Sequence, residues 1–180
     1  MQKAVGYCVA AILVMALTTS AEARVVESTP GGFSVTFSSK VAATPDAIWA
    51  QMLHPERWWS KSHSWSGDAA NFSLRAEPGG CFCEKLPGGG FAEHARVIYA
   101  APGKMLRLSG GFGPLQGEGI AGTLTMRMKP GEEGTTTIDF DYVVGGYARF
   151  DLKEMSSAVD SVIGEQHKRL VDLMLNGKVD

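Results

Sequence analysis

The sequence has few of the features that identify a function directly. It holds three cysteines in 180 residues, too few for the disulfide framework of a small secreted domain. Its 17 basic and 19 acidic side chains leave a net charge of −2. Without a basic excess or a Lys/Arg cluster, nucleic acid is not expected as a partner.

Sequence motifs of the common catalytic classes are also missing. The chain has no Ser-His-Asp order, no G-x-S-x-G, no phosphate-binding loop and no H-E-x-x-H. Cofactors and resident metals are therefore not expected. What remains is one domain-sized chain whose function has to come from a binding site or from chemistry without a familiar motif.

The N-terminus has the layout of a secretory signal peptide. Lys3 precedes an apolar run from Ala4 to Leu17, and Ala21-Glu22-Ala23 supplies an A-x-A cleavage site. Cleavage after Ala23 would give a periplasmic or secreted protein with no membrane span. An uncleaved anchor is the alternative, although this run is shorter than the roughly 20 residues that cross a bilayer. We expect residues 24–32 to be a mobile lead-in and residues 33–177 to form the domain.

The strongest local signal is a long C-terminal helix over residues 152–176. Asp151 can cap its start, with Glu154 three residues on, and Asn176-Gly177 can end it. Apolar residues recur along one face at the helical period. They are Leu152, Met155, Val159, Val162, Ile163, Leu170, Leu173 and Met174.

Upstream, the pattern predicts strands spaced for hairpins. Two short helices, starting at Pro45 and at Pro55, follow the first strand. The strands alternate apolar and polar residues, which is typical of an antiparallel sheet with one wet face. The predicted strands are 33–41, 72–76, 81–86, 91–99, 105–109, 120–128 and 135–144. The fold class is therefore α+β.

Two stretches resemble the START-like or SRPBCC superfamily. One is Ala43-Thr44-Pro45-Asp46-Ala47-Ile48-Trp49 with His54-Pro55-Glu56-Arg57-Trp58-Trp59. The other is Glu77-Pro78-Gly79-Gly80-Cys81-Phe82 with Val97, Pro102 and Leu106. The second is similar to polyketide cyclase/dehydrase-like proteins and to homologues of the heat-shock ATPase activator domain.

The resemblance implies a helix-grip fold, in which a curved seven-stranded antiparallel sheet wraps around the long C-terminal helix. It also implies a binding cavity between the sheet and that helix. Met155, Val159 and Val162 on the helix are then expected to line the cavity. Gly164, costly in mid-helix by about 1 kcal/mol relative to Ala, marks a place where a strand or ligand approaches closely.

Strand alternation selects the polar candidates for this cavity. Phe82 and Glu84 share one face of their strand, and Glu93 and Tyr99 share one face of the next. Glu84 or Glu93 is the candidate general acid/base or ligand anchor; the alternative is a pair of carboxylates wetted at the open end of the hairpin. Tyr99 and Tyr142 can offer hydroxyls to a ligand or to protein groups.

Aromatic residues concentrate at Trp58, Trp59 and Trp65. The resemblance implies that this region helps to close the mouth of the cavity, so Trp58 and Trp59 are candidate ligand contacts. The alternative is that one of them fills the core. His63, in a serine-rich loop, is expected to be solvated.

Cys81 and Cys83 should project from the face opposite Phe82, and His94 from the same side of its own strand. A soft metal is one interpretation, but a fourth ligand is missing. Redox cross-linking is another, although an extended strand suits disulfide geometry poorly. Two free thiols without a role are the third.

The absence of catalytic spacing favours binding over catalysis. The sequence therefore predicts an exported protein that holds a small hydrophobic molecule in its cavity. The alternative is a cyclase- or dehydratase-type enzyme that uses a pocket carboxylate for proton transfer.

Overall fold

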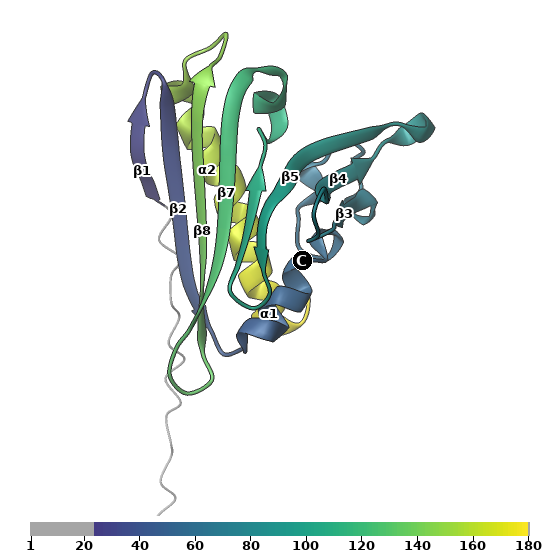
Figure 1. Cartoon of the computed structure of the whole chain (residues 1–180), viewed down its shortest axis with the longest axis vertical. Coiled ribbons are helices and arrows are strands. Elements are labelled where there is room, and N and C mark those ends of the chain that lie inside the picture. Colours follow the sequence, from purple (N-terminus) through teal and green to yellow (C-terminus); the bar gives the residue numbers. More distant parts are fainter. Residues whose placement is uncertain (1–23, 180) are drawn as a thin grey trace, which may run out of the picture.

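The computed structural model describes residues 24–179, which form one antiparallel sheet and a long C-terminal helix (Figure 1). The sheet has eight strands in the order β1-β2-β8-β7-β6-β5-β4-β3. It curves without closing, and β3, β4 and β5 extend away from the helix as a separate arm. The predicted signal peptide lies outside the described residues.

The strands are β1 (Arg24–Thr29), β2 (Gly32–Val41), β3 (Phe72–Leu74), β4 (Cys81–Lys85), β5 (Phe91–Ala101), β6 (Met105–Ser109), β7 (Gly119–Pro130) and β8 (Thr136–Tyr147). The α-helices are α1 (Pro45–Met52) and α2 (Leu152–Asn176). Short 3-10 turns are η1 (Pro55–Arg57), η2 (Lys61–His63), η3 (Ala69–Asn71), η4 (Pro87–Gly89) and η5 (Gly113–Gly117).

The predicted α+β class, with an antiparallel sheet and a C-terminal helix, is confirmed, but two details were wrong. The lead-in is partly a strand, because the Pro30-Gly31 turn folds β1 back onto β2 and pairs Thr29 with Gly32. The sheet consequently has eight strands instead of seven. The second short helix is the single turn η1, because the backbone at Trp58 leaves the helical region with φ −134°.

Helix α2 has the bounds that the sequence predicted. The Asp151 carboxylate accepts a hydrogen bond from the Lys153 amide, and Gly177 ends the helix with a left-handed φ of 71°. The helix packs on β1, β2 and β8. Its buried face is more polar than the predicted stripe, since it includes Ser156, Gln166 and His167.

A β-bulge in β5 reverses the predicted facing of His94 and of the side chains that precede it. Phe82 pairs with Ala95 and Cys83 pairs with Glu93, so His94 is an extra residue that faces no partner in the ladder. A bulge of this kind shifts the inside-outside alternation by one residue. As a result His94 and Ala95 are both buried, and Glu93 lies on the outer face. The prediction that Glu93 points inward was wrong for this reason.

A second bulge follows on the same strand. Val97 pairs with Leu108 and Tyr99 pairs with Arg107, which leaves Ile98 as the extra residue. Tyr99 is consequently 49% exposed, with the Arg107 guanidinium 5.7 Å from its ring centre. The predicted inward position of Tyr99 was also wrong.

Candidate ligand-binding cavity

A cavity of about 250 Å³ lies between the N-terminal half of α2, the loop from η1 to β3, the start of η5 and β5. Helix α2 contributes a mainly aliphatic wall, consisting of Met155, Ala158, Val159, Val162 and Ile163. The other walls combine aromatic rings with a few polar groups, from Trp59, Ser62, His63, Ser64, Trp65, His94, Phe112, Gly113 and Pro114. A mostly apolar wall with few polar groups is typical of a small-molecule site.

His94 is the buried polar group of this wall, and it is held from behind. Its Nε2 atom lies 2.9 Å from Oε2 of Glu84, and the two side chains are 5% and 0% exposed. The Glu84 carboxylate also accepts the backbone N–H groups of Trp65, at 3.1 Å, and Ser66, at 2.6 Å. An ionised carboxylate can only accept hydrogen bonds, so Nε2 of His94 is the ring nitrogen that carries the proton.

The charge states of the pair follow from the same contacts. Burial by itself would raise the pKa of Glu84, but hydrogen bonds from Ser66, Trp65 and His94 outweigh it and hold this pKa below its ordinary value of 4.5. Burial lowers the pKa of His94 below 6.5, although Glu84 opposes that shift. At neutral pH the pair is therefore a carboxylate and a neutral imidazole.

The second ring nitrogen of His94 is free to act on a ligand. Within the described part of the chain, Nδ1 of His94 makes no hydrogen bond. A neutral imidazole with its N–H on Nε2 carries a lone pair on Nδ1. The ring can thus accept a hydrogen bond or a proton from a molecule in the cavity, while Glu84 fixes its orientation.

No family model and no curated protein matches the chain. Solved structures share its shape. It resembles CalU16 from Micromonospora echinospora at a TM-score of 0.57 and 15% identity, over 90% of this chain and 88% of that one. It also resembles EF2215 from Enterococcus faecalis, a conserved protein of unknown function, at a TM-score of 0.60 and 12% identity, over 89% and 80% of the two chains.

A protein from Rhizobium leguminosarum gives a TM-score of 0.56 at 18% identity and covers 89% of this chain and all of that one (100%). The architecture fits a helix-grip fold. At these identities the likeness concerns the fold alone, and the site has to be read from this chain's own residues.

Hydrogen bonds to α2 and to Glu84 fasten the loop that covers the cavity. The Ser60 amide donates to Oε1 of the buried Gln166 at 2.7 Å, and Nε2 of His63 lies 2.9 Å from Oε2 of Glu165. Further along, the loop is attached to Glu84 through two backbone amides, as described above. The expectation that His63 is merely solvated was wrong, because it pairs with α2 and lines the cavity.

The three tryptophans of this region have different positions. Trp58 is a core residue, 2% exposed, with its ring against Phe140. Trp59 is buried but forms part of the cavity wall, with Phe82 packed behind it at a centroid distance of 4.8 Å. Trp65 is 56% exposed at the rim. Thus Trp59 is placed to contact a ligand, whereas Trp58 and Phe82 support the wall from behind.

The other predicted polar candidates do not meet at the cavity. Glu93 pairs with Arg96 at 2.8 Å on the outer face. The Tyr142 hydroxyl is buried, donates to the Gly110 carbonyl at 3.0 Å and accepts the Phe112 amide at 3.3 Å. Burial raises the pKa of Tyr142 far above its usual value, so it stays protonated. It therefore supports the loop before η5 instead of facing the cavity.

Cys81 and Cys83 form a disulfide on the outer face of β4. Two residues of a regular strand span about 6.6 Å, near the upper limit for a disulfide, whereas these Cα atoms are 5.5 Å apart, close to the most frequent separation. Of the three interpretations of these cysteines, the structure shows the cross-linked one. Donor atoms of the two cysteines and Glu93 lie within 4.8 Å of one another, but bonded sulfurs offer a metal no thiolate.

Sequence reasoning also placed His94 wrongly, on the face with the cysteines. The bulge that turns it inward depends on pairing between β4 and β5, which strand alternation cannot show. The sequence did contain a signal for buried polar side chains at Gln166 and His167, since these two adjacent polar residues interrupt an apolar helix face.

In the part of the chain that the structure describes, no helix is long and apolar enough to cross a membrane.

Proposed function

We propose that this protein binds a small, largely apolar molecule in the cavity between its sheet and α2. One observation carries the proposal: an apolar wall surrounds a buried, neutral His94 whose Nδ1 has no partner among the described residues. A volume of about 250 Å³ lies just below the roughly 300–1,000 Å³ of drug-sized sites. The ligand is therefore small, and a single polar group orients it.

The polar group of the ligand is a hydrogen-bond donor. A lone pair on Nδ1 can only accept, so a hydroxyl or N–H on the ligand satisfies it. Ser64 also favours a ligand that carries a polar group. Its Oγ atom is buried without a hydrogen bond among the described residues, and the residue lines the same cavity. Buried polar groups of this kind normally have partners.

The experiment begins with the purified protein as it comes from cells. It is extracted with organic solvent, and any released small molecule is identified by mass spectrometry. In parallel, its melting temperature is measured against phenols, indoles, sterols and fatty acids. A co-purified apolar ligand, or stabilisation by a ring compound carrying a hydroxyl or N–H, supports the proposal. An empty protein whose melting temperature no compound moves contradicts it.

We further propose that the protein works outside the cytoplasm, in the periplasm or as a secreted protein. The signal-peptide pattern of the first 23 residues supports this. The Cys81–Cys83 disulfide agrees with it, because disulfides persist mainly in oxidising compartments. N-terminal sequencing of the exported protein should begin at Arg24. An intact Met1 in the membrane fraction would instead indicate an uncleaved anchor.

A second candidate function is proton transfer of the cyclase or dehydratase type. It is favoured by the buried His94–Glu84 pair, in which an oriented neutral imidazole can take a proton from a bound substrate. Removing a general base typically costs about 10²- to 10⁴-fold in rate. With a substrate identified, His94→Gln and Glu84→Gln should lose activity to that extent, whereas Glu93→Gln on the outer face should not. Full turnover in His94→Gln would eliminate this candidate.

A further inference from the structure

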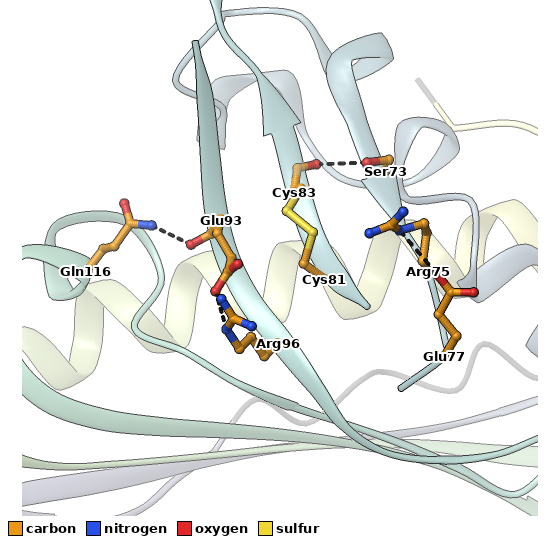
Figure 2. The surroundings of a disulfide bond; sticks show 8 residues. All are labelled: Ser73, Arg75, Glu77, Cys81, Cys83, Glu93, Arg96 and Gln116. Carbon is orange, nitrogen blue, oxygen red and sulfur yellow. Dashed lines mark hydrogen bonds and ion pairs between the residues drawn. A yellow bond between two sulfur atoms is a disulfide. The ribbon is translucent and has the colours of Figure 1, made fainter. Parts of the chain in front are cut away.

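The Cys81–Cys83 disulfide lies outside the cavity and has no role in the function proposed above. Both cysteines are on β4 and are partly exposed, while Phe82 between them is buried. Figure 2 shows the bond running along β4, with Ser73 of β3 on one side and Glu93 of β5 on the other. The sulfurs are thus on the solvent side of the sheet arm.

This disulfide adds little to the stability of the fold. A disulfide stabilises mainly by closing a loop in the unfolded chain, and the effect grows with loop length. Here the sequence separation is two, so almost no chain is constrained. The bond also joins no separate elements, because β4 is already paired with β3 and with β5. A role other than stability is needed to explain it.

Charged side chains of β5 lie beside both sulfurs. Cys81 lies opposite Arg96 in the ladder with β5, and Cys83 lies opposite Glu93. Arg96 and Glu93 form an ion pair at 2.8 Å, and a carboxylate oxygen of Glu93 lies within 4.8 Å of both sulfurs. The two cysteines therefore have similar electrostatic surroundings, and a thiolate from solution can attack either exposed sulfur.

We propose that Cys81 and Cys83 form a redox-active disulfide that exchanges electrons with an external dithiol. The first thiolate of the reductant attacks one of the two sulfurs, a mixed disulfide forms and the other cysteine leaves as the thiolate. The second thiol of the reductant then attacks its own sulfur in the mixed disulfide and releases the remaining cysteine as a thiolate. In total the protein disulfide gains two electrons and two protons, and the dithiol is oxidised to its disulfide.

The test measures the redox equilibrium of the full chain carrying Cys8→Ser, so that only Cys81 and Cys83 can react. The protein is equilibrated with glutathione buffers of graded oxidised-to-reduced ratio, with EDTA present to exclude metal binding. Free thiols are trapped by alkylation and assigned by peptide mapping. We expect the free thiols of Cys81 and Cys83 to appear together and reversibly at ratios of oxidised to reduced glutathione within this series, as for other exposed disulfides.

Two variants separate the redox role from a structural one. Cys81→Ser and Cys83→Ser, which each leave one cysteine, should each form a stable mixed disulfide in oxidised glutathione, because no second thiol is present to release the glutathione. The Cys81→Ser/Cys83→Ser double variant should keep the melting temperature of the parent within about 2 °C, since little chain is constrained.

Three results would overturn the proposal. One is a bond that stays oxidised in every glutathione buffer and yields only to excess dithiothreitol. Another is a protein whose two cysteines never pair under oxidising conditions. The third is a double variant with a strongly lowered melting temperature, which would make the bond structural.

Discussion

The Nε2 atom of His94 lies 2.9 Å from Oε2 of Glu84, and both side chains are almost completely buried. Two residues that differ by ten positions meet because a bulge in β5 turns His94 toward the inner face of β4. The pair connects the covering loop, through the amides that Glu84 accepts, to the wall of the cavity.

Removing the charge of Glu84 should change the titration of His94. Glu84→Gln eliminates the carboxylate that raises the pKa of His94, while burial continues to lower it. We expect the pKa of this imidazole to fall further, and the free energy of unfolding to drop by about 1–3 kcal/mol because a charged hydrogen-bond acceptor is lost. NMR titration of the imidazole and denaturant unfolding measure the two effects. A pKa that rises toward 6.5 would show that the pair is not formed in solution.

The protein should lose stability in mild acid. Burial lowers the pKa values of His94 and His167 below the ordinary 6.5, so both are neutral in the folded protein. Between those lowered values and 6.5 the unfolded chain binds more protons, and the free energy of unfolding therefore decreases as the pH falls through this window. Glu84 adds to the loss at lower pH, since its depressed pKa favours the folded state only while it is ionised.

Melting temperatures recorded from pH 7.5 to pH 4.5 measure this slope. His167→Leu should reduce the slope of melting temperature against pH, because it removes a buried imidazole that is neutral in the folded protein and takes up a proton when the chain unfolds. Ser157→Ala, at an exposed position of the same helix and without a titratable group, provides the control and should keep the parental slope. An equal slope in His167→Leu would assign the acid sensitivity to other groups.

Filling the cavity should block binding without unfolding the protein. Met155 lies on α2 at the cavity wall and is only partly buried, so the larger ring in Met155→Trp can extend into the open volume. We expect the affinity for any identified ligand to fall at least 10-fold, or about 1.4 kcal/mol, with the melting temperature retained. Leu175→Trp, at an exposed position near the end of the same helix, is the control. Collapse of the fold in Met155→Trp would make this wall part of the packed core.

Gly164 should resist the substitution that usually stabilises a helix. A Cβ atom at this position would lie 2.7 Å from Cε1 and 3.1 Å from Cζ of Phe37, so β2 makes the close approach expected from the sequence. Overpacking costs about 1–3 kcal/mol, which exceeds the gain of about 1 kcal/mol in helix propensity. We expect Gly164→Ala to lower the free energy of unfolding in chemical denaturation.

A matched pair of variants isolates the contact with Phe37. Ser157→Ala, at an exposed position of α2, should raise stability by a few tenths of a kcal/mol. Gly164→Ala should lower the free energy of unfolding less in a protein that carries Phe37→Leu than in the parent, because the smaller side chain leaves room for the added methyl group. Equal effects of Gly164→Ala in both backgrounds would mean that the ring does not restrict this position.

The sequence alone determined the elements whose signals are local. The bounds of α2 followed from Asp151, Gly177 and a 3.6-residue period, because caps and periodicity depend only on neighbours along the chain. The helical period also placed Met155, Val159 and Val162 on one face of α2; that this face lines a cavity was an implication of the family resemblance, and all three residues line the cavity of the structure.

The tertiary structure decided the features that depend on strand pairing. The bulges at His94 and Ile98 moved His94 inward and Glu93 and Tyr99 outward, because an unpaired residue puts the side chains before it and those after it out of step with a strict alternation. The Cys81–Cys83 bond likewise depends on how far β4 departs from a regular strand. The family resemblance therefore implied a cavity beside α2, and the pairing between β4 and β5 decided which polar residue faces it.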